Sequence, residues 1–178
     1  TALGAFLAEL LVLARDPADP VAICSLLDNR WTRFGLDRAE TRARGGAIDR
    51  ALRGVRPGPD LAAFAARAKG RGAATLEALD LALAPLVAVS EDRARAAAFA
   101  RAHAQAAEAA AAGPERDGAP WLGAEGEAAA GLLRELIDES AAMEPVDLAG
   151  YARIFHALAA MRTAVSYTHL RAHETKAN

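Results

Sequence analysis

The stretch Val146-Asp-Leu-Ala-Gly-Tyr-Ala-Arg-Ile-Phe-His-Ala-Leu-Ala-Ala-Met161 carries the clearest helix signal in the chain. Asp147 is a good N-cap, because its carboxylate can accept hydrogen bonds from free backbone N–H groups in the first turn. Val146 precedes the cap and can pack against Tyr151 as a hydrophobic staple. Apolar side chains then recur at the helical period of about 3.6 residues, at Tyr151, Ile154, Phe155, Leu158 and Met161. The sequence therefore predicts a final helix with one buried stripe.

The same helical period runs through the rest of the chain. A first helix is expected at Ala2–Arg15, buried through Leu3, Phe6, Leu7, Leu10 and Leu11, and a second is expected after the cap Asp19, with Val21, Cys24 and Leu27 facing inward. Further helices are expected at about 37–53, 60–69, 75–89 and 124–142, and Ser90 is expected to cap a helix that reaches about residue 112. Gly70-Arg71-Gly72 is expected to end the fourth helix. No strand and no fixed-period repeat is predicted.

The composition favours the same fold class. Hydrophobic residues make up 53% of the 178-residue chain but aromatic residues only 5%, and alanine is the commonest residue. Alanine is the best helix former and buries little area, which favours closely packed helices over an extended sheet. The predicted fold is all-α, an irregular multi-helix domain. No apolar run approaches the roughly 18 residues that span a bilayer, so no membrane partner is predicted. Cys24, the single cysteine, fits a reducing compartment and a structural thiol.

The basic stretch, defined here as residues 30–71, is the strongest candidate for a binding function. It holds 11 basic and 4 acidic residues, so it carries +7 in a chain whose net charge is −2. A local surplus of this kind can mark contact with a polyanion. The candidate phosphate-binding residues are Arg33, Arg38, Arg42, Arg50 and Arg53, with Trp31 and Phe34 as nearby aromatics for stacking on bases. The alternative interpretation is a solvated helix face.

Catalytic signatures are missing from the sequence. It holds no G-x-x-x-x-G-K-[ST] phosphate loop and no C-x-x-C pair. Glu135, Asp138 and Glu139 fall on adjacent turns of one helix, where they are expected to form its solvated face. His103 is expected to be an ordinary surface or interface histidine. No catalytic residue, metal ligand or cofactor is therefore assigned to this segment.

Several phrases in the sequence resemble AddB of the alphaproteobacterial type, in order and spacing over most of residues 1–164. They are Asp16-Pro-Ala-Asp-Pro-Val-Ala-Ile-Cys-Ser-Leu-Leu, Phe34-Gly-Leu-Asp-Arg-Ala-Glu, Leu52-Arg-Gly-Val-Arg-Pro-Gly-Pro, Leu81-Ala-Leu-Ala-Pro-Leu, Trp121-Leu-Gly-Ala-Glu-Gly-Glu-Ala and Val146-Asp-Leu-Ala-Gly-Tyr-Ala-Arg-Ile-Phe. The segment Asp28-Asn29-Arg30-Trp31 departs from the Lys-His-Pro-like turn towards which the family tends.

The resemblance implies a role in double-strand break repair. AddB pairs with AddA, and the complex unwinds and resects DNA ends using ATP, in the cytoplasm. Residues 1–164 would be an internal helical insertion of the UvrD- or RecC-like helicase portion, serving as a scaffold, as a contact with the AddA subunit and as a guide for DNA. The family's nuclease domain, with its magnesium and iron–sulfur cluster, would lie outside this chain. The alternative is a free-standing helical module that binds another protein.

The C-terminal residues 165–178 are predicted to be a non-native or disordered tail. From Ser166 the sequence turns polar and mixed, and it resembles a peptide produced when sequencing-adapter DNA is translated. His169, His173 and Glu174 have the spacing of a helical zinc site, but two histidines without further ligands do not define a metal centre. They are excluded from the prediction together with the tail.

Overall fold

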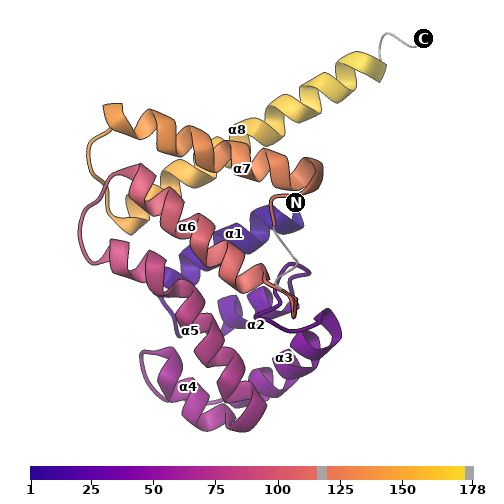
Figure 1. Cartoon of the computed structure of the whole chain (residues 1–178), viewed down its shortest axis with the longest axis vertical. Helices are drawn as coiled ribbons and strands as arrows, with labels where there is room; N and C mark the ends of the chain where they lie inside the picture. Colours follow the sequence, from indigo (N-terminus) through magenta and orange to yellow (C-terminus); the bar gives the residue numbers. More distant parts are fainter. Residues whose placement is uncertain (116–119, 175–178) are drawn as a thin grey trace.

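A computed structural model describes the backbone of residues 1–115 and 120–174 and the side chains of these residues up to Arg162. The side chains of His169, His173 and Glu174 lie outside the described residues. The interpretation of residues 165–178 as a non-native or disordered tail therefore stays a prediction. The described backbone forms eight α-helices, one 3-10 turn and no strand, which confirms the predicted all-α class (Figure 1). The helices are α1 (Ala2–Arg15), α2 (Pro20–Asp28), α3 (Arg38–Leu52), α4 (Leu61–Ala68), α5 (Gly70–Ser90), α6 (Ala96–Ala111), α7 (Gly123–Glu139) and α8 (Leu148–Glu174), and the 3-10 turn is η1 (Ser140–Ala142).

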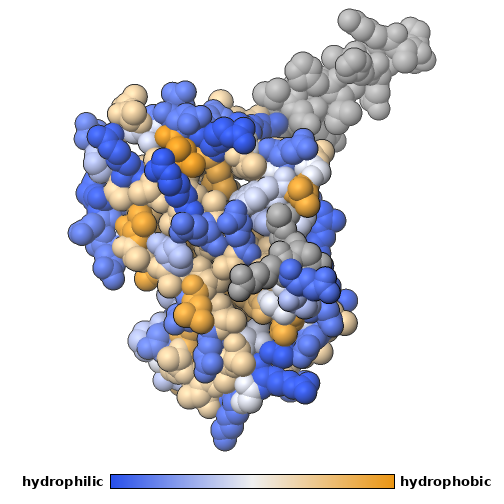
Figure 2. Space-filling view, in the orientation of Figure 1, coloured by the Kyte–Doolittle hydropathy of each residue, from blue (hydrophilic) through white to orange (hydrophobic). Residues whose placement is uncertain are grey.

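Helix α1 lies at the centre of the arrangement. It contacts α2, α5, α6, α7 and α8, so helices from both ends of the sequence meet on it (Figure 1). Its predicted inner face is confirmed, because Leu3, Phe6, Leu7, Leu10 and Leu11 are all buried. Around it, α5 packs between α4 and α6, and α6 packs against α7. On the visible surface, strongly apolar residues appear only in small separate areas (Figure 2).

Aspartate caps fix where four of the helices begin. Asp19 accepts from the N–H groups of residues 21 and 22 at 2.9 and 3.1 Å. Pro20 occupies the first helical position of α2, as expected. Asp37, Asp60 and Asp147 each accept from the N–H three residues further on, at 2.8, 2.9 and 2.7 Å. Each cap satisfies a backbone donor that the helix leaves free, which is worth about 1 kcal/mol.

Two of the predicted helix boundaries were wrong. Gly70 opens α5 instead of closing α4, because Lys69 turns the chain between the two helices with a φ of 57°. Gly72 is buried within α5, where an added Cβ would lie 3.2 Å from Ala68, so this glycine serves close helix packing. Ser90 ends α5 and its hydroxyl donates to the carbonyl of Val87 at 2.7 Å, whereas α6 begins only at Ala96.

The predicted inner face of α2 was also wrong in part. The buried residues are Ala22, Ile23, Leu26 and Leu27, whereas Val21 is 76% exposed.

Among the described helices, α5 is the one long and apolar enough to cross a membrane by length and composition. Four of its leucines, Leu76, Leu79, Leu83 and Leu86, are buried in the core, whereas Leu81 is 76% exposed.

Candidate nucleic-acid interface

The exposed face of α3, together with its C-cap residue Arg53, holds three of the five arginines predicted to contact phosphate. Arg42, Arg50 and Arg53 are all exposed, and at 100° per residue they share one arc of the helix. At about 1.5 Å per residue they extend over roughly 16 Å along its axis. The helix runs unbroken through Gly45 and Gly46, so the face is continuous.

The partners of these three arginines are weak or missing. Arg42 faces Asp28 at 3.7 Å, with both side chains 75% exposed. Arg53, the C-cap of α3, pairs at 2.6 Å with Asp49, four residues earlier. Arg50 has no side-chain partner among the described residues. Ion pairs this exposed contribute about 0–1 kcal/mol, so an incoming phosphate can displace the carboxylates.

The remaining two candidates are placed differently. The guanidinium of Arg38 donates to the carbonyl of Leu27 at 3.2 Å and also to that of Asp28, so it caps the C-terminal end of α2. Arg33 lies in the loop before α3, where its N–H donates to the carbonyl of Ala110 at 2.9 Å and its side chain is half-buried. The structure therefore brings three of the five candidates together on one face and gives Arg38 a structural role.

Several other arginines of the basic stretch are also held within the fold. Arg30 pairs with Glu125 at 2.5 Å, and Arg44 pairs with Glu40 at 2.6 Å. Arg67 donates to three carbonyls near the end of α3, those of residues 51, 53 and 55. The guanidinium of Arg56 donates hydrogen bonds to the carboxylate of Asp16. The charge of +7 counted along the sequence thus overstates the positive charge that a polyanion would meet.

The aromatic residues beside the arginines are engaged in the fold. Trp31 is half-buried, with the Arg30 guanidinium 5.6 Å from the centre of its ring. Its buried indole N–H has no acceptor among the described residues. Phe34 has a φ of 51°, a conformation that is costly for a large side chain. This turn directs the N–H groups of Phe34 and Gly35 to the carbonyls of Ala110 and Ala112 at the C-terminal end of α6. Neither ring forms an open stacking platform.

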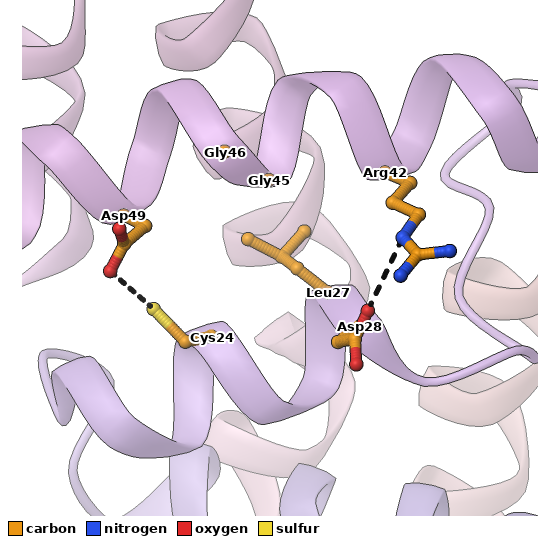
Figure 3. A pocket seen from close by; sticks show the side chains of 7 residues that line it. All are labelled: Cys24, Leu27, Asp28, Arg42, Gly45, Gly46 and Asp49. Carbon is orange, nitrogen blue, oxygen red and sulfur yellow. Dashed lines mark hydrogen bonds and ion pairs between the residues drawn. The ribbon is translucent and has the colours of Figure 1, made fainter.

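A hollow of about 270 Å³ lies between α2 and α3, next to the arginine face (Figure 3). Leu27 points into it, Gly45 and Gly46 border it, and two polar pairs frame it, Arg42 with Asp28 and Cys24 with Asp49. Burial raises the pKa of the Cys24 thiol, and the negative charge of Asp49 raises it further. A thiol with a raised pKa is a poor nucleophile, in agreement with the expected structural role.

The last three carboxylates of α7 lie on its solvated side. Asp138 and Glu139 are exposed and Glu135 pairs with Arg162 at 2.5 Å, which matches the predicted solvated face of α7. Within the part of the chain that the structure describes, no three His, Cys, Asp or Glu side chains are close enough to hold a metal ion.

The sequence prediction missed one polar site in the core. His103 was expected at the surface or at an interface, but it is fully buried within the fold. Its Nε2 lies 2.9 Å from the carbonyl oxygen of Leu7 and its Nδ1 3.1 Å from the hydroxyl of Tyr151. Because a carbonyl only accepts, Nε2 carries the proton and Nδ1 accepts from Tyr151. His103 therefore joins α1, α6 and α8 as a neutral ring, and burial lowers its pKa to about 4. No chemical pattern in the sequence signals these partners, which lie 96 and 48 residues away.

The comparisons with known proteins give no relative: no family, curated protein or solved structure matches this chain.

Proposed function

We propose that the chain is a non-catalytic helical segment of an AddB-like subunit of a cytoplasmic double-strand break repair helicase–nuclease. Its roles are to act as a scaffold, to contact the AddA-like partner and to guide DNA. The observation that carries the DNA role is the exposed arc of Arg42, Arg50 and Arg53 on α3. The family assignment rests on the sequence phrases described above.

The geometry of this arc suits backbone contact without base recognition. Arginine guanidiniums position nucleic acid by binding phosphate oxygens, and such contacts carry no direct sequence information. The carboxylates of Asp28 and Asp49 hold two of the guanidiniums only by exposed pairs. Such exposed pairs yield to a phosphate at little cost.

The test is salt-dependent binding to a forked DNA duplex, measured by fluorescence anisotropy. Three phosphate contacts predict a slope of about −2.7 in a plot of log K against log salt, so affinity should fall about 40-fold between roughly 50 and 200 mM salt. In the double variant Arg50→Gln/Arg53→Gln the slope should shrink by about 1.8.

The matched control removes the same charge elsewhere. Arg101 on α6 and Arg134 on α7 are exposed and have no side-chain partner within the described part of the chain. Arg101→Gln/Arg134→Gln should leave the slope close to that of the unmodified chain. Equal losses of DNA affinity in the two double variants would show a non-specific electrostatic attraction to the whole chain. Absence of DNA binding by the unmodified chain at low salt would refute the DNA role.

A second candidate function is a free-standing helical module that binds another protein. Large apolar side chains stand exposed on separate elements, with Val21 and Leu81 each 76% accessible. Sequencing the source locus across the codons for Ala164 to Asn178 separates the two candidates. A frame that continues past Val165 into helicase-like strands supports the AddB-like segment, whereas a genomic tail with a stop after Asn178 favours the module.

A further inference from the structure

A groove of about 460 Å³ lies between the second half of α1 and the first turns of α8. Its floor is apolar and includes Leu11, Leu148 and Ala152, which also belong to or border the hydrophobic core. Val12, also part of the lining, is 42% exposed. The groove is therefore a surface feature with an open apolar floor.

Among the described residues that line this groove, every charged or titratable side chain is basic. They are Arg15 from α1 and Arg153 and His156 from α8, all exposed. Arg15 and Arg153 have no ion pair and no side-chain hydrogen bond among the described residues. Both differ in this from most arginines of the basic stretch, which are held by carboxylates or carbonyls.

The carboxylates next to these residues in the chain are already occupied. Asp16 follows Arg15 but binds Arg56, and Asp147 precedes α8 but accepts from the N–H of Gly150 at 2.7 Å. Among the described residues, neither guanidinium is therefore paired with a carboxylate. Unbalanced charge beside an apolar floor is complementary to a surface of the opposite sign that carries an apolar side chain.

We propose that this groove docks an acidic amphipathic segment of a partner protein. An apolar side chain of the segment enters the floor between α1 and α8, and its flanking carboxylates meet Arg15 and Arg153. A segment lying along the surface fits the exposure of the arginines and Val12, whereas a small-molecule site encloses most of its ligand. The inference rests on the partner-contact role proposed above and is independent of the DNA role.

The experiment uses a fluorescein-labelled helical peptide with leucines on one face and glutamates flanking them, titrated with the full chain. A peptide with lysines in place of the glutamates serves as the charge control. The acidic peptide should bind saturably and the basic peptide should not. Arg15→Gln/Arg153→Gln should weaken binding about tenfold, as expected for the loss of two exposed charge contacts.

Further variants separate this groove from the DNA face. Val12→Ser should weaken peptide binding severalfold, whereas Arg50→Gln/Arg53→Gln and the charge-matched Arg101→Gln/Arg134→Gln should leave it unchanged. Circular dichroism should show the same helix content in every variant, because all of the replaced side chains are exposed or half-exposed. If the unmodified chain bound DNA but not the acidic peptide, the groove assignment alone would be overturned.

Three other outcomes would also overturn it. Equal affinity for the acidic and basic peptides would show an apolar surface without charge selectivity. Displacement of the peptide by dodecanoate at a comparable concentration would identify a small amphiphilic carboxylate as the occupant. Self-association in sedimentation that Arg15→Gln/Arg153→Gln abolishes would identify a second copy of this chain.

Discussion

The buried His103 predicts a loss of stability at mildly acidic pH. The ring is neutral in the fold, with a pKa lowered to about 4 by burial, against an ordinary value of 6.5. Between these two values the unfolded chain binds a proton that the folded chain refuses, so the free energy of unfolding falls as pH falls. Above pH 6.5 the neutral ring costs nothing, and the stabilisation is fully present there.

The size of the effect follows from the two pKa values. From about pH 7.5 to about pH 5 the linkage amounts to about 2 kcal/mol. That is a large part of the 5–15 kcal/mol by which a domain of this kind is stable. The assay is urea unfolding followed by circular dichroism at several pH values in this range.

Variants isolate the contribution of His103 from other titrating groups. His103→Gln should flatten the pH dependence, and His156→Gln, which removes an exposed imidazole, should keep most of it. Asp16 and Glu125 have lowered pKa values, so they reduce the free energy of unfolding as pH falls, mainly below about pH 5. Burial raises the pKa of Glu9, so this carboxyl increases the free energy of unfolding as pH falls, opposite to His103. The variant Glu9→Gln measures that contribution, which can then be subtracted. An equal slope in the unmodified chain and His103→Gln would refute the argument.

Two further predictions concern the packing around this site. Phe99 is fully buried and stacks on Tyr151 with ring centroids 5.2 Å apart, so Phe99→Ala should lower the free energy of unfolding by about 3–5 kcal/mol, and a loss below about 1 kcal/mol in urea titration would contradict the packing. Asp147→Ala should cost about 1 kcal/mol in the same assay because it removes the cap of α8, whereas Asp147→Asn should retain most of the stability.

Local signals explain which parts of the fold could be predicted. The caps Asp19 and Asp147 act on backbone groups two or three residues away, so the sequence itself contains both partners of each bond. The boundaries that failed depend on tertiary contacts. Gly70 opens a helix because Lys69 adopts a left-handed conformation, and Gly72 is buried against residues of α3 and α4. An isolated glycine pair favours a break, but packing overrides that preference.

The candidate interface shows the same limit. Its composition could be predicted, because a surplus of arginine is visible in a count along the chain. Which guanidiniums are free could not be predicted, since Arg30 is held by Glu125, which lies 95 residues away, and Arg67 by carbonyls at the end of another helix. The groove between α1 and α8 escaped the sequence analysis for the same reason, because it joins residues from opposite ends of the chain.

The central position of α1 has a consequence for synthesis on the ribosome. This helix is made before α6 and α8, yet its polar contact to His103 and its packing against α8 need residues made about a hundred or more positions later. At about 5–20 residues per second, roughly 7 to 28 s pass between the synthesis of the leucine face of α1 and that of Tyr151. Nascent chains that stop short of Tyr151 would leave that face open to chaperones, so early truncation should direct this protein to them.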